Sequence, residues 1–246
     1  MNPESGNLIQ QQTRQSPVYA LLRKPSFIDF PGCLCRVLFV SGCNLRCKFC
    51  HNFDLVNPKE KNIEWERLGK ILLISRENWI EGVCITGGEP TLHPKLSELI
   101  LWLKKLGFKV KLDTNGTLPE VLGEVLPLVD YVAMDYKAPL ESYPGITDRP
   151  GLCLERIAES KELILEWGGD YEFRTTVIEG LHTAQDMRAI CRELEGARRY
   201  VLQAFVPAPG MDAGNGLPRK RTPIALLRQY HEICREYFEE PILRGG

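Results

Sequence analysis

The chain is 246 residues long and 43% hydrophobic, which is enough apolar material for one α/β domain with a substantial core and short for two. Its 31 basic and 32 acidic residues nearly cancel, so the composition does not indicate a surface for nucleic acid or membranes. Nine cysteines would suit a small secreted protein with disulfides, but there is no signal-like amino-terminal run and no apolar stretch of the ~20 residues that span a membrane. We therefore expect a cytoplasmic protein that binds neither nucleic acid nor membrane and recognises its partner locally.

In chain order, a polar stretch comes first and is followed by alternating strand and helix patterns. Residues 1–17 are rich in Gln, Asn, Ser and Pro, so we expect a disordered leader before a single domain over residues 18–246. Repeated strand–helix units predict a parallel sheet with right-handed crossovers, and from the pattern alone an open doubly wound sheet is an alternative to a barrel. The predicted strands are 37–41, 82–86, 108–113, 129–135, 171–178 and 199–205, and the predicted helices are 63–76, 94–106, 119–126, 152–167, 183–195 and 223–239.

The most informative stretch follows the first predicted strand and contains Cys43, Cys47 and Cys50 in the spacing C-x3-C-x2-C. A loop this short can turn three thiolates onto one small inorganic centre and leave one coordination position without a protein ligand. A structural zinc site normally has four protein ligands, and a self-sufficient iron–sulfur cluster normally has four cysteines. From the triplet alone, a zinc knuckle completed by His51 or by Cys84 is the alternative.

The triplet, with the aromatic Phe49 just before its third cysteine, resembles the cluster-binding motif of the radical S-adenosylmethionine (SAM) superfamily. Residues 87–90, Gly-Gly-Glu-Pro, follow a predicted strand and resemble the SAM-binding motif of the same superfamily. The resemblance implies a partial (β/α)6 TIM-like barrel in which the three cysteines hold three irons of a single [4Fe–4S] cluster and SAM chelates the fourth. The two glycines would let the backbone approach the ligand, and an ordinary strand-to-helix turn is the alternative.

A narrower resemblance rests on residues 27–32 (Phe-Ile-Asp-Phe-Pro-Gly), 50–52 (Cys-His-Asn), 112–116 (Leu-Asp-Thr-Asn-Gly) and 132–137 (Val-Ala-Met-Asp-Tyr-Lys). Together these stretches resemble the glycyl-radical-enzyme activating enzymes, closest to those of anaerobic ribonucleotide reductases, over about residues 24–206. The resemblance implies reductive cleavage of SAM and removal of a hydrogen from a backbone glycine of an anaerobic ribonucleoside-triphosphate reductase. The implied electron donor is reduced flavodoxin or ferredoxin. The alternatives are a radical SAM enzyme that acts on a small molecule, such as a deazaguanine-forming synthase, and a zinc-binding module without catalysis.

The same resemblance assigns the ligand contacts. Asp113, Thr114 and Asp135, with the carbonyl of Ala133, would form a site for a monovalent cation beside the SAM carboxylate. A surface or helix-capping role is the alternative for the two aspartates. Gln203 stands where some activating enzymes have a histidine that touches SAM. The residues implied in SAM binding are Phe49, His51, Gly87, Gly88, Glu89, Asp113, Thr114, Asp135, Tyr136, Lys137 and Gln203.

The remaining cysteines are expected to be ordinary thiols. Cys33 and Cys35 form a C-x-C pair that could bind a metal, but their place at the start of a strand pattern favours buried thiols. The 36-residue interval between the third cluster cysteine and the first glycine of the Gly-Gly-Glu motif leaves no room for a ferredoxin-like insert, which is why we expect one cluster only. The cysteines that lie inside strand or helix patterns, and are predicted to pack in the core, are Cys84, Cys153, Cys191 and Cys234.

Overall fold

The computed structural model describes residues 14–207 and 220–245, so the first thirteen residues of the predicted leader lie outside the described part of the chain. The next residues are already paired. The backbone N–H of Ser16 donates to the carbonyl of Ile63 at 2.9 Å, and the Ser16 side chain is buried. Within the described ranges, no helix is long and apolar enough to cross a membrane.

The chain separates into two compact units by its internal contacts. The expectation of a single domain stays a prediction. Unit 1 comprises the residues up to 44 with 54–113 and 127–130, and unit 2 comprises 45–53, 114–126 and the residues from 131 onward.

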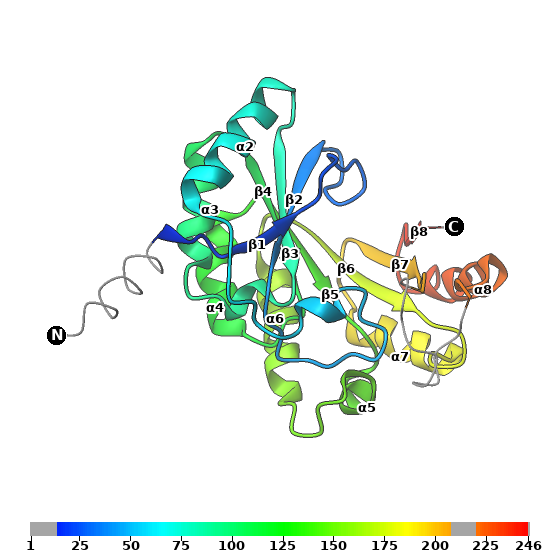
Figure 1. The fold of residues 1–246 in the computed structure, drawn as a ribbon. Coiled ribbons are helices and arrows are strands. Elements are labelled where there is room, and N and C mark those ends of the chain that lie inside the picture. The colour runs from blue at the N-terminus through cyan, green and yellow to red at the C-terminus, as the bar shows by residue number, and fades with distance from the viewer. Residues whose placement is uncertain (1–13, 208–219, 246) are drawn as a thin grey trace. The chain divides into compact units, whose positions relative to one another are not determined.

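The strands of unit 1 pair side by side in chain order (Figure 1). Strand β1 (Val18–Leu21) runs antiparallel to β2 (Cys35–Val40), which runs parallel to β3 (Gly82–Gly87), and β3 runs parallel to β4 (Lys109–Thr114). The last residues of β2 and β3 are paired with each other. The cysteine loop and the Gly-Gly-Glu motif therefore leave the sheet at the same edge, where parallel α/β sheets place their ligands.

Two helices of unit 1 carry their apolar residues on one face. Helix α2 (Trp65–Glu77) buries Leu68 and Leu72, and α3 (Leu96–Lys105) buries four residues along one stripe. Arg36, on the outward face of β2, donates to the Ser75 hydroxyl of α2 at 2.8 Å, which places this helix on the outer face of the sheet. Trp65 and Trp102 join the two helices edge to face, with ring centroids 4.9 Å apart.

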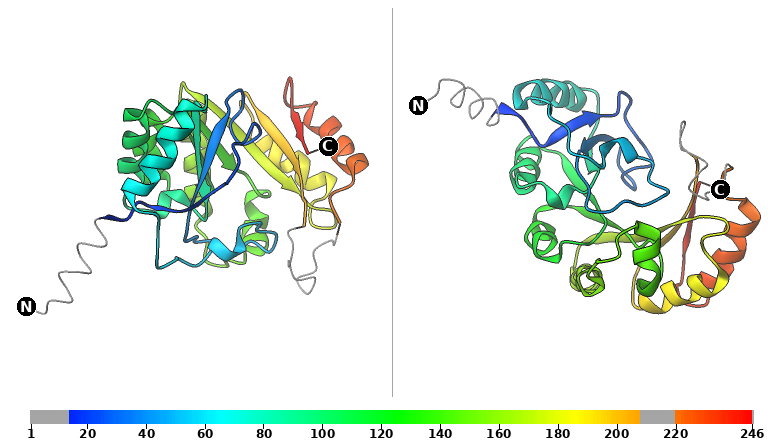
Figure 2. Two further views of the ribbon diagram at one scale, coloured as in Figure 1. Left: turned by 45° about the horizontal axis from the view of Figure 1, so that its top comes forward. Right: turned by 60° about the horizontal axis from the view of Figure 1, so that its bottom comes forward.

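Unit 2 continues the strand–helix alternation. Its strands β5 (Tyr131–Asp135), β6 (Asp170–Val177), β7 (Tyr200–Ala204) and β8 (Ile242–Arg244) are parallel neighbours in that order. Helix α8 packs on β7 and β8, and α7 packs on α8 (Figure 2). The helices of this unit are α4 (Pro119–Val125), α5 (Tyr143–Thr147), α6 (Leu154–Glu166), α7 (Ala184–Glu193) and α8 (Ile224–Cys234).

Strand β8 is too short to predict from an apolar pattern, and a buried ion pair explains why it is held in place. The two terminal nitrogens of Arg244 donate to the two carboxylate oxygens of Glu172, each at 2.8 Å. Glu172 is fully buried and also accepts from the Tyr131 hydroxyl at 3.1 Å. A buried carboxylate requires such partners, because removing them would leave an uncompensated charge.

The predicted strands and helices are all present, with small differences at their ends. The largest difference is the last helix, which ends at Cys234 instead of residue 239. Single-turn 3-10 helices were not expected, and within the described residues they are η1 (Phe53–Leu55), η2 (Pro90–Leu92), η3 (Leu126–Leu128) and η4 (Leu140–Ser142).

Candidate functional site

In unit 1, the start of the cysteine loop is fixed through its backbone. The N–H of Gly42 donates to the carbonyl of Leu55 at 2.7 Å, and the N–H of Cys43 donates to the carbonyl of Val56 at 2.8 Å. Cys43 is half-buried and is in no disulfide. Its backbone is therefore held while its side chain keeps some access to solvent.

The Gly-Gly-Glu motif lies directly against this loop start. The N–H of Gly88 donates to the carbonyl of Val40 at 2.9 Å, and the N–H of Glu89 donates to the carbonyl of Gly42 at 2.8 Å. A Cβ atom on Gly87 would lie 2.3 Å from the Val40 carbonyl oxygen, and one on Gly88 would lie 2.0 Å from the Gly42 carbonyl oxygen. Both positions thus require glycine because two backbone segments meet there, which is a reason independent of any ligand.

Glu89 is 2% exposed and its side chain is oriented by the next turn. One carboxylate oxygen accepts from the backbone N–H of Thr91 at 3.2 Å and from the Thr91 hydroxyl at 2.6 Å. These bonds cap the N-terminus of η2. The carboxylate is consequently held at the carboxyl end of β3 in one orientation.

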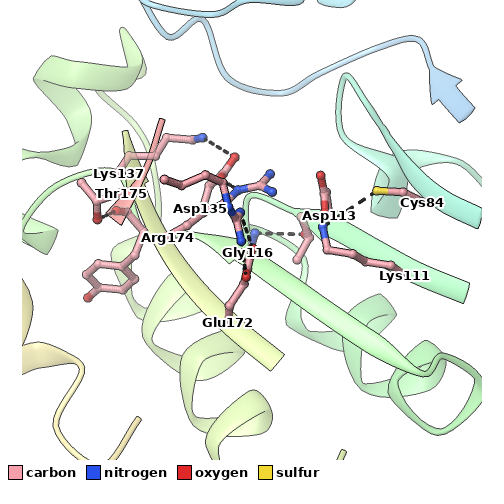
Figure 3. Close-up of polar contacts among 12 residues, drawn as sticks. Cys84, Lys111, Asp113, Gly116, Asp135, Lys137, Glu172, Arg174 and Thr175 are labelled. Atoms are coloured by element: carbon pink, nitrogen blue, oxygen red, sulfur yellow. Dashed lines mark hydrogen bonds and ion pairs between the residues drawn. The ribbon is translucent and has the colours of Figure 1, made fainter. Parts of the chain in front are cut away.

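The end of β4 carries a buried ion pair. Lys111 and Asp113 lie two residues apart on the strand, so their side chains share one face. The Lys111 ammonium is hydrogen-bonded to the Asp113 carboxylate and lies 3.9 Å from the Cys84 sulfur of β3 (Figure 3). Lys111 is 1% exposed and Asp113 is 8% exposed. No sequence motif indicates Lys111 as part of this group.

In unit 2, the rest of the cysteine loop is also anchored. The N–H of Arg46 donates to the carbonyl of Thr147, and the N–H of Cys50 donates to the carbonyl of Cys47. Burial raises the pKa of the Cys47 thiol, the charge of Lys137 lowers it, and the net shift is upward. The His51 ring lies edge to face against Phe205, with centroids 6.0 Å apart.

The carboxylate of Asp135, at the end of β5, has two cationic partners in unit 2 (Figure 3). Arg174 of β6 donates to one oxygen, and the Lys137 ammonium lies 3.1 Å from the other. Burial raises the pKa of Asp135, but the charges of Arg174 and Lys137 outweigh burial and hold that pKa well below its usual range. Burial lowers the pKa of Lys137, but the charge of Asp135 raises this pKa by a larger amount. Lys137 is therefore a cation at neutral pH.

Other predicted contact residues have defined surroundings. The Tyr136 ring is buried, and its hydroxyl donates to the Glu193 carboxylate at 2.8 Å. The Thr114 hydroxyl accepts from the N–H of Gly116 at 3.1 Å and thereby shapes the turn after β4. Gln203 is partly exposed near the end of β7. A SAM contact by the Tyr136 hydroxyl would have to coexist with its bond to Glu193.

His182 is a buried residue that the sequence analysis missed. Its Nδ1 accepts from the N–H of Ile178 at 3.1 Å, so the neutral ring carries its proton on Nε2, which lies 2.9 Å from the carbonyl oxygen of Lys137. The Tyr230 hydroxyl donates to the His182 carbonyl at 2.7 Å. This histidine therefore fixes the backbone of Lys137 just after β5.

Because His182 is buried in its neutral form, stability is expected to fall in mild acid. Burial lowers the pKa of His182 below its ordinary value of 6.5, so in mild acid the unfolded chain binds a proton at this residue more readily than the folded chain does. The free energy of unfolding should decrease by roughly 1 kcal/mol through this group as pH falls below the unfolded pKa. Chemical denaturation of the native chain and of His182→Gln at pH 7.5 and 5.5 measures it. Equal pH dependence of the two proteins would contradict this assignment.

The thiols fit an iron–sulfur cluster by their chemistry, since soft thiolates are the usual ligands of such clusters. Within residues 14–207 and 220–245, no three His, Cys, Asp or Glu side chains are gathered closely enough to hold a metal ion. The identity of the ligands therefore rests on spacing.

The remaining cysteines are mostly buried, as expected. Burial raises the pKa of Cys35 to about 12, and Cys33 donates to its neighbour's carbonyl. The prediction that Cys153 packs in the core is wrong, because this residue is exposed at the N-cap of α6.

A family model described as "Radical SAM superfamily" matches residues 37–194. A Methanocaldococcus jannaschii protein, provisionally named a glycyl-radical enzyme activating enzyme, is 29% identical over 89% of this chain and 92% of its own length. The 7-carboxy-7-deazaguanine synthase of Thermococcus kodakarensis is 28% identical over 70% of this chain and 75% of its own length. The crystal structure of Streptococcus suis SuiB bound to SAM is similar with a TM-score of 0.64 at 18% identity, over 82% of this chain and 48% of that one.

These comparisons confirm the predicted architecture. The strands are mostly parallel and alternate with helices, which is the α/β fold of the partial TIM-like barrel type expected from the motifs. The family match covers the cysteine loop, the Gly-Gly-Glu motif and both aspartates.

Proposed function

Because the chain belongs to the radical SAM superfamily, whose enzymes use a [4Fe–4S] cluster and SAM, we propose that Cys43, Cys47 and Cys50 hold one cluster in this protein. Three thiolates leave one iron for the amino and carboxylate groups of SAM. When bound, the cluster and SAM would supply radical chemistry after one-electron reduction. The protein contributes position and electrostatics.

The observation that best supports this proposal is the contact between two motifs inside unit 1. The backbone of Gly88 and Glu89 is bonded to β2 and to Gly42, the residue before the first cluster cysteine. A ligand that binds at the Gly-Gly-Glu motif would therefore lie beside the start of the cysteine loop. In unit 2, burial raises the pKa of Cys47, the charge of Lys137 lowers it and that of Asp135 raises it. The later part of the cysteine loop is thereby linked to residues 132–137.

The proposed SAM contacts are those that the resemblance implies. Glu89 accepts from the SAM amino group, and its orientation is already set by Thr91. Lys137, as a cation, binds the carboxylate of SAM. Phe49 and the backbone of His51 lie by the adenine. The other proposed contacts are Gly87, Gly88, Asp113, Thr114, Asp135, Tyr136 and Gln203.

The proposed reaction is removal of a hydrogen atom from a backbone glycine of a partner enzyme. Support comes from the resemblance of residues 112–116 and 132–137 to activating enzymes and from the similarity to the M. jannaschii protein over nearly the whole of both chains. A glycine in a flexible loop of the partner has no side chain to obstruct entry of that loop into the SAM site. We propose an anaerobic ribonucleoside-triphosphate reductase as the partner, and reduced flavodoxin or ferredoxin as the electron donor.

The test is a spectroscopic measurement on the partner. The reconstituted protein, reduced and supplied with SAM, should generate a glycine-centred doublet in the electron paramagnetic resonance spectrum of a co-expressed anaerobic reductase. A reductase variant with alanine at the radical-bearing glycine is the matched control and should stay silent. Cleavage of SAM without any doublet on the native reductase would contradict the proposed partner.

A second candidate is a radical SAM enzyme that acts on a small molecule. The similarity to the T. kodakarensis deazaguanine synthase favours it, at nearly the same identity but over less of the chain. Formation of 7-carboxy-7-deazaguanine by the reduced protein in a mixture of small metabolites and SAM, without a partner protein, would support this candidate over the first.

A further inference from the structure

We infer that this chain neutralises its strand-end aspartates with its own cations and needs no monovalent metal ion to bind SAM, with the Lys111 ammonium taking the place of that ion at Asp113. The inference rests on the proposed SAM site. It differs from the expectation that Asp113, Thr114 and Asp135 share a monovalent cation.

The first observation is the ion pair at the end of β4. The ammonium of Lys111 is hydrogen-bonded to the carboxylate of Asp113, and both residues are almost fully buried. The strand alternation directs both side chains to the same face, two residues apart. Lys111 lies between the buried apolar residues Val110 and Leu112, and a lysine is stable there because it carries the charge that the carboxylate requires.

The second observation is the same arrangement in unit 2. One oxygen of Asp135 accepts from Arg174, and the other is 3.1 Å from the Lys137 ammonium. Arg174 comes from the neighbouring strand, at the position paired with Asp135 in the sheet register. Asp113 therefore has a cationic partner, Lys111, within unit 1, and Asp135 has cationic partners within unit 2.

A metal ion would have to compete with these groups. An ammonium and a potassium ion carry the same single charge and both bind carboxylate oxygens. A second cation placed beside Lys111 would meet a like charge that water and salt screen poorly, because the group is buried. If the ion displaced the ammonium, the lysine would be left buried without its ion-pair partner. The ion pair thus disfavours metal binding at Asp113 in both cases.

Lys111 is consequently a positioning residue that acts through Asp113. It holds the carboxylate in one orientation and supplies the positive charge that would otherwise come from solution. SAM affinity should then be insensitive to the identity of the monovalent cation. Removing the ammonium should create a vacancy for a small cation and make SAM binding depend on it.

The experiment measures SAM affinity of the reconstituted holoprotein by calorimetry. Buffers of equal ionic strength contain choline, sodium or potassium as the sole monovalent cation, and the variants are Lys111→Met, Lys111→Gln and Lys109→Met. The last is a matched control, since Lys109 is exposed on the same strand. The native chain and the control should bind SAM equally well in all three buffers, within about two-fold. The Lys111 variants should bind about ten-fold more weakly in choline and recover in potassium or sodium.

A second readout does not need the cofactors. The melting temperature of the cluster-free chain should be the same in choline and potassium, whereas that of Lys111→Met should rise in potassium. A native chain whose SAM affinity falls ten-fold in choline would overturn the inference, and so would Lys111 variants that bind SAM weakly in every buffer. Loss of SAM binding by the native chain in all buffers would instead overturn the proposed SAM site itself.

Discussion

Replacing Cys47 with alanine is expected to abolish reductive cleavage of SAM, a fall of at least about a thousand-fold, as when one member of a group that acts together is lost. Cys47 is buried, and only Cys43 and Cys50 would remain to hold the cluster. Two thiolates leave two irons without protein ligands, so the cluster should be lost or degraded. Iron and sulfide content, together with 5'-deoxyadenosine formed under dithionite, measure the effect.

The controls are cysteines outside the triplet. Cys33→Ala and Cys153→Ala should retain about four irons and four sulfides per chain and near-native cleavage, because one thiol is buried at the start of a strand pattern and the other is exposed on α6. Full cluster content in Cys47→Ala would show that the ligands have been assigned to the wrong residues. Stoichiometric zinc without labile sulfide in the native chain would show that the protein binds zinc instead of an iron–sulfur cluster.

Gly88→Ala is expected to damage both stability and SAM binding. The added Cβ would lie 2.0 Å from the carbonyl oxygen of Gly42, and that atom belongs to backbone that cannot rotate away. The same carbonyl accepts from the N–H of Glu89, so the motif must shift and take the glutamate with it. We expect a loss of about 1–3 kcal/mol in the free energy of unfolding and at least about ten-fold weaker SAM binding.

Gly145→Ala is the matched control for this change. A Cβ there meets no atom within 4 Å, so the free energy of unfolding and the SAM affinity should both stay close to native. Urea denaturation and calorimetry of the two variants give the comparison. Native SAM affinity in a folded Gly88→Ala protein would show that the motif does not bind the ligand.

Most of the fold could be predicted because strand–helix repeats produce strong apolar patterns. The strands and helices with long patterns are present close to their predicted ends. The elements that were missed are too short to show a period. Strand β1 has four residues and β8 has three, and each is held by a partner distant in sequence. The Val18 carbonyl of β1 accepts from the N–H of Ile63, and Arg244 of β8 pairs with Glu172.

The site could be predicted only in part, since motifs name residues without giving their partners. Gly87 and Gly88 were expected to serve a ligand, but each is first required by a backbone contact, Gly87 with Val40 of β2 and Gly88 with Gly42. Lys111 in a strand suggests a solvent-facing residue, and only its spacing from Asp113 could have indicated an ion pair on one face. Arg174 and His182 act on residues that are distant in sequence. Arg174 binds Asp135, 39 residues earlier, and His182 contacts the carbonyl of Lys137, 45 residues earlier.

Hydrogen removal from a partner glycine is tested by following deuterium from the partner into 5'-deoxyadenosine. An anaerobic reductase with deuterated glycine is incubated with the reduced protein and unlabelled SAM, and the nucleoside is analysed by mass spectrometry. The account predicts one deuterium in the 5'-deoxyadenosine formed in the first turnover, with a glycyl radical on the reductase. Unlabelled 5'-deoxyadenosine from this mixture would contradict it, and label acquired in a parallel reaction from a deuterated small metabolite would indicate a small-molecule substrate instead.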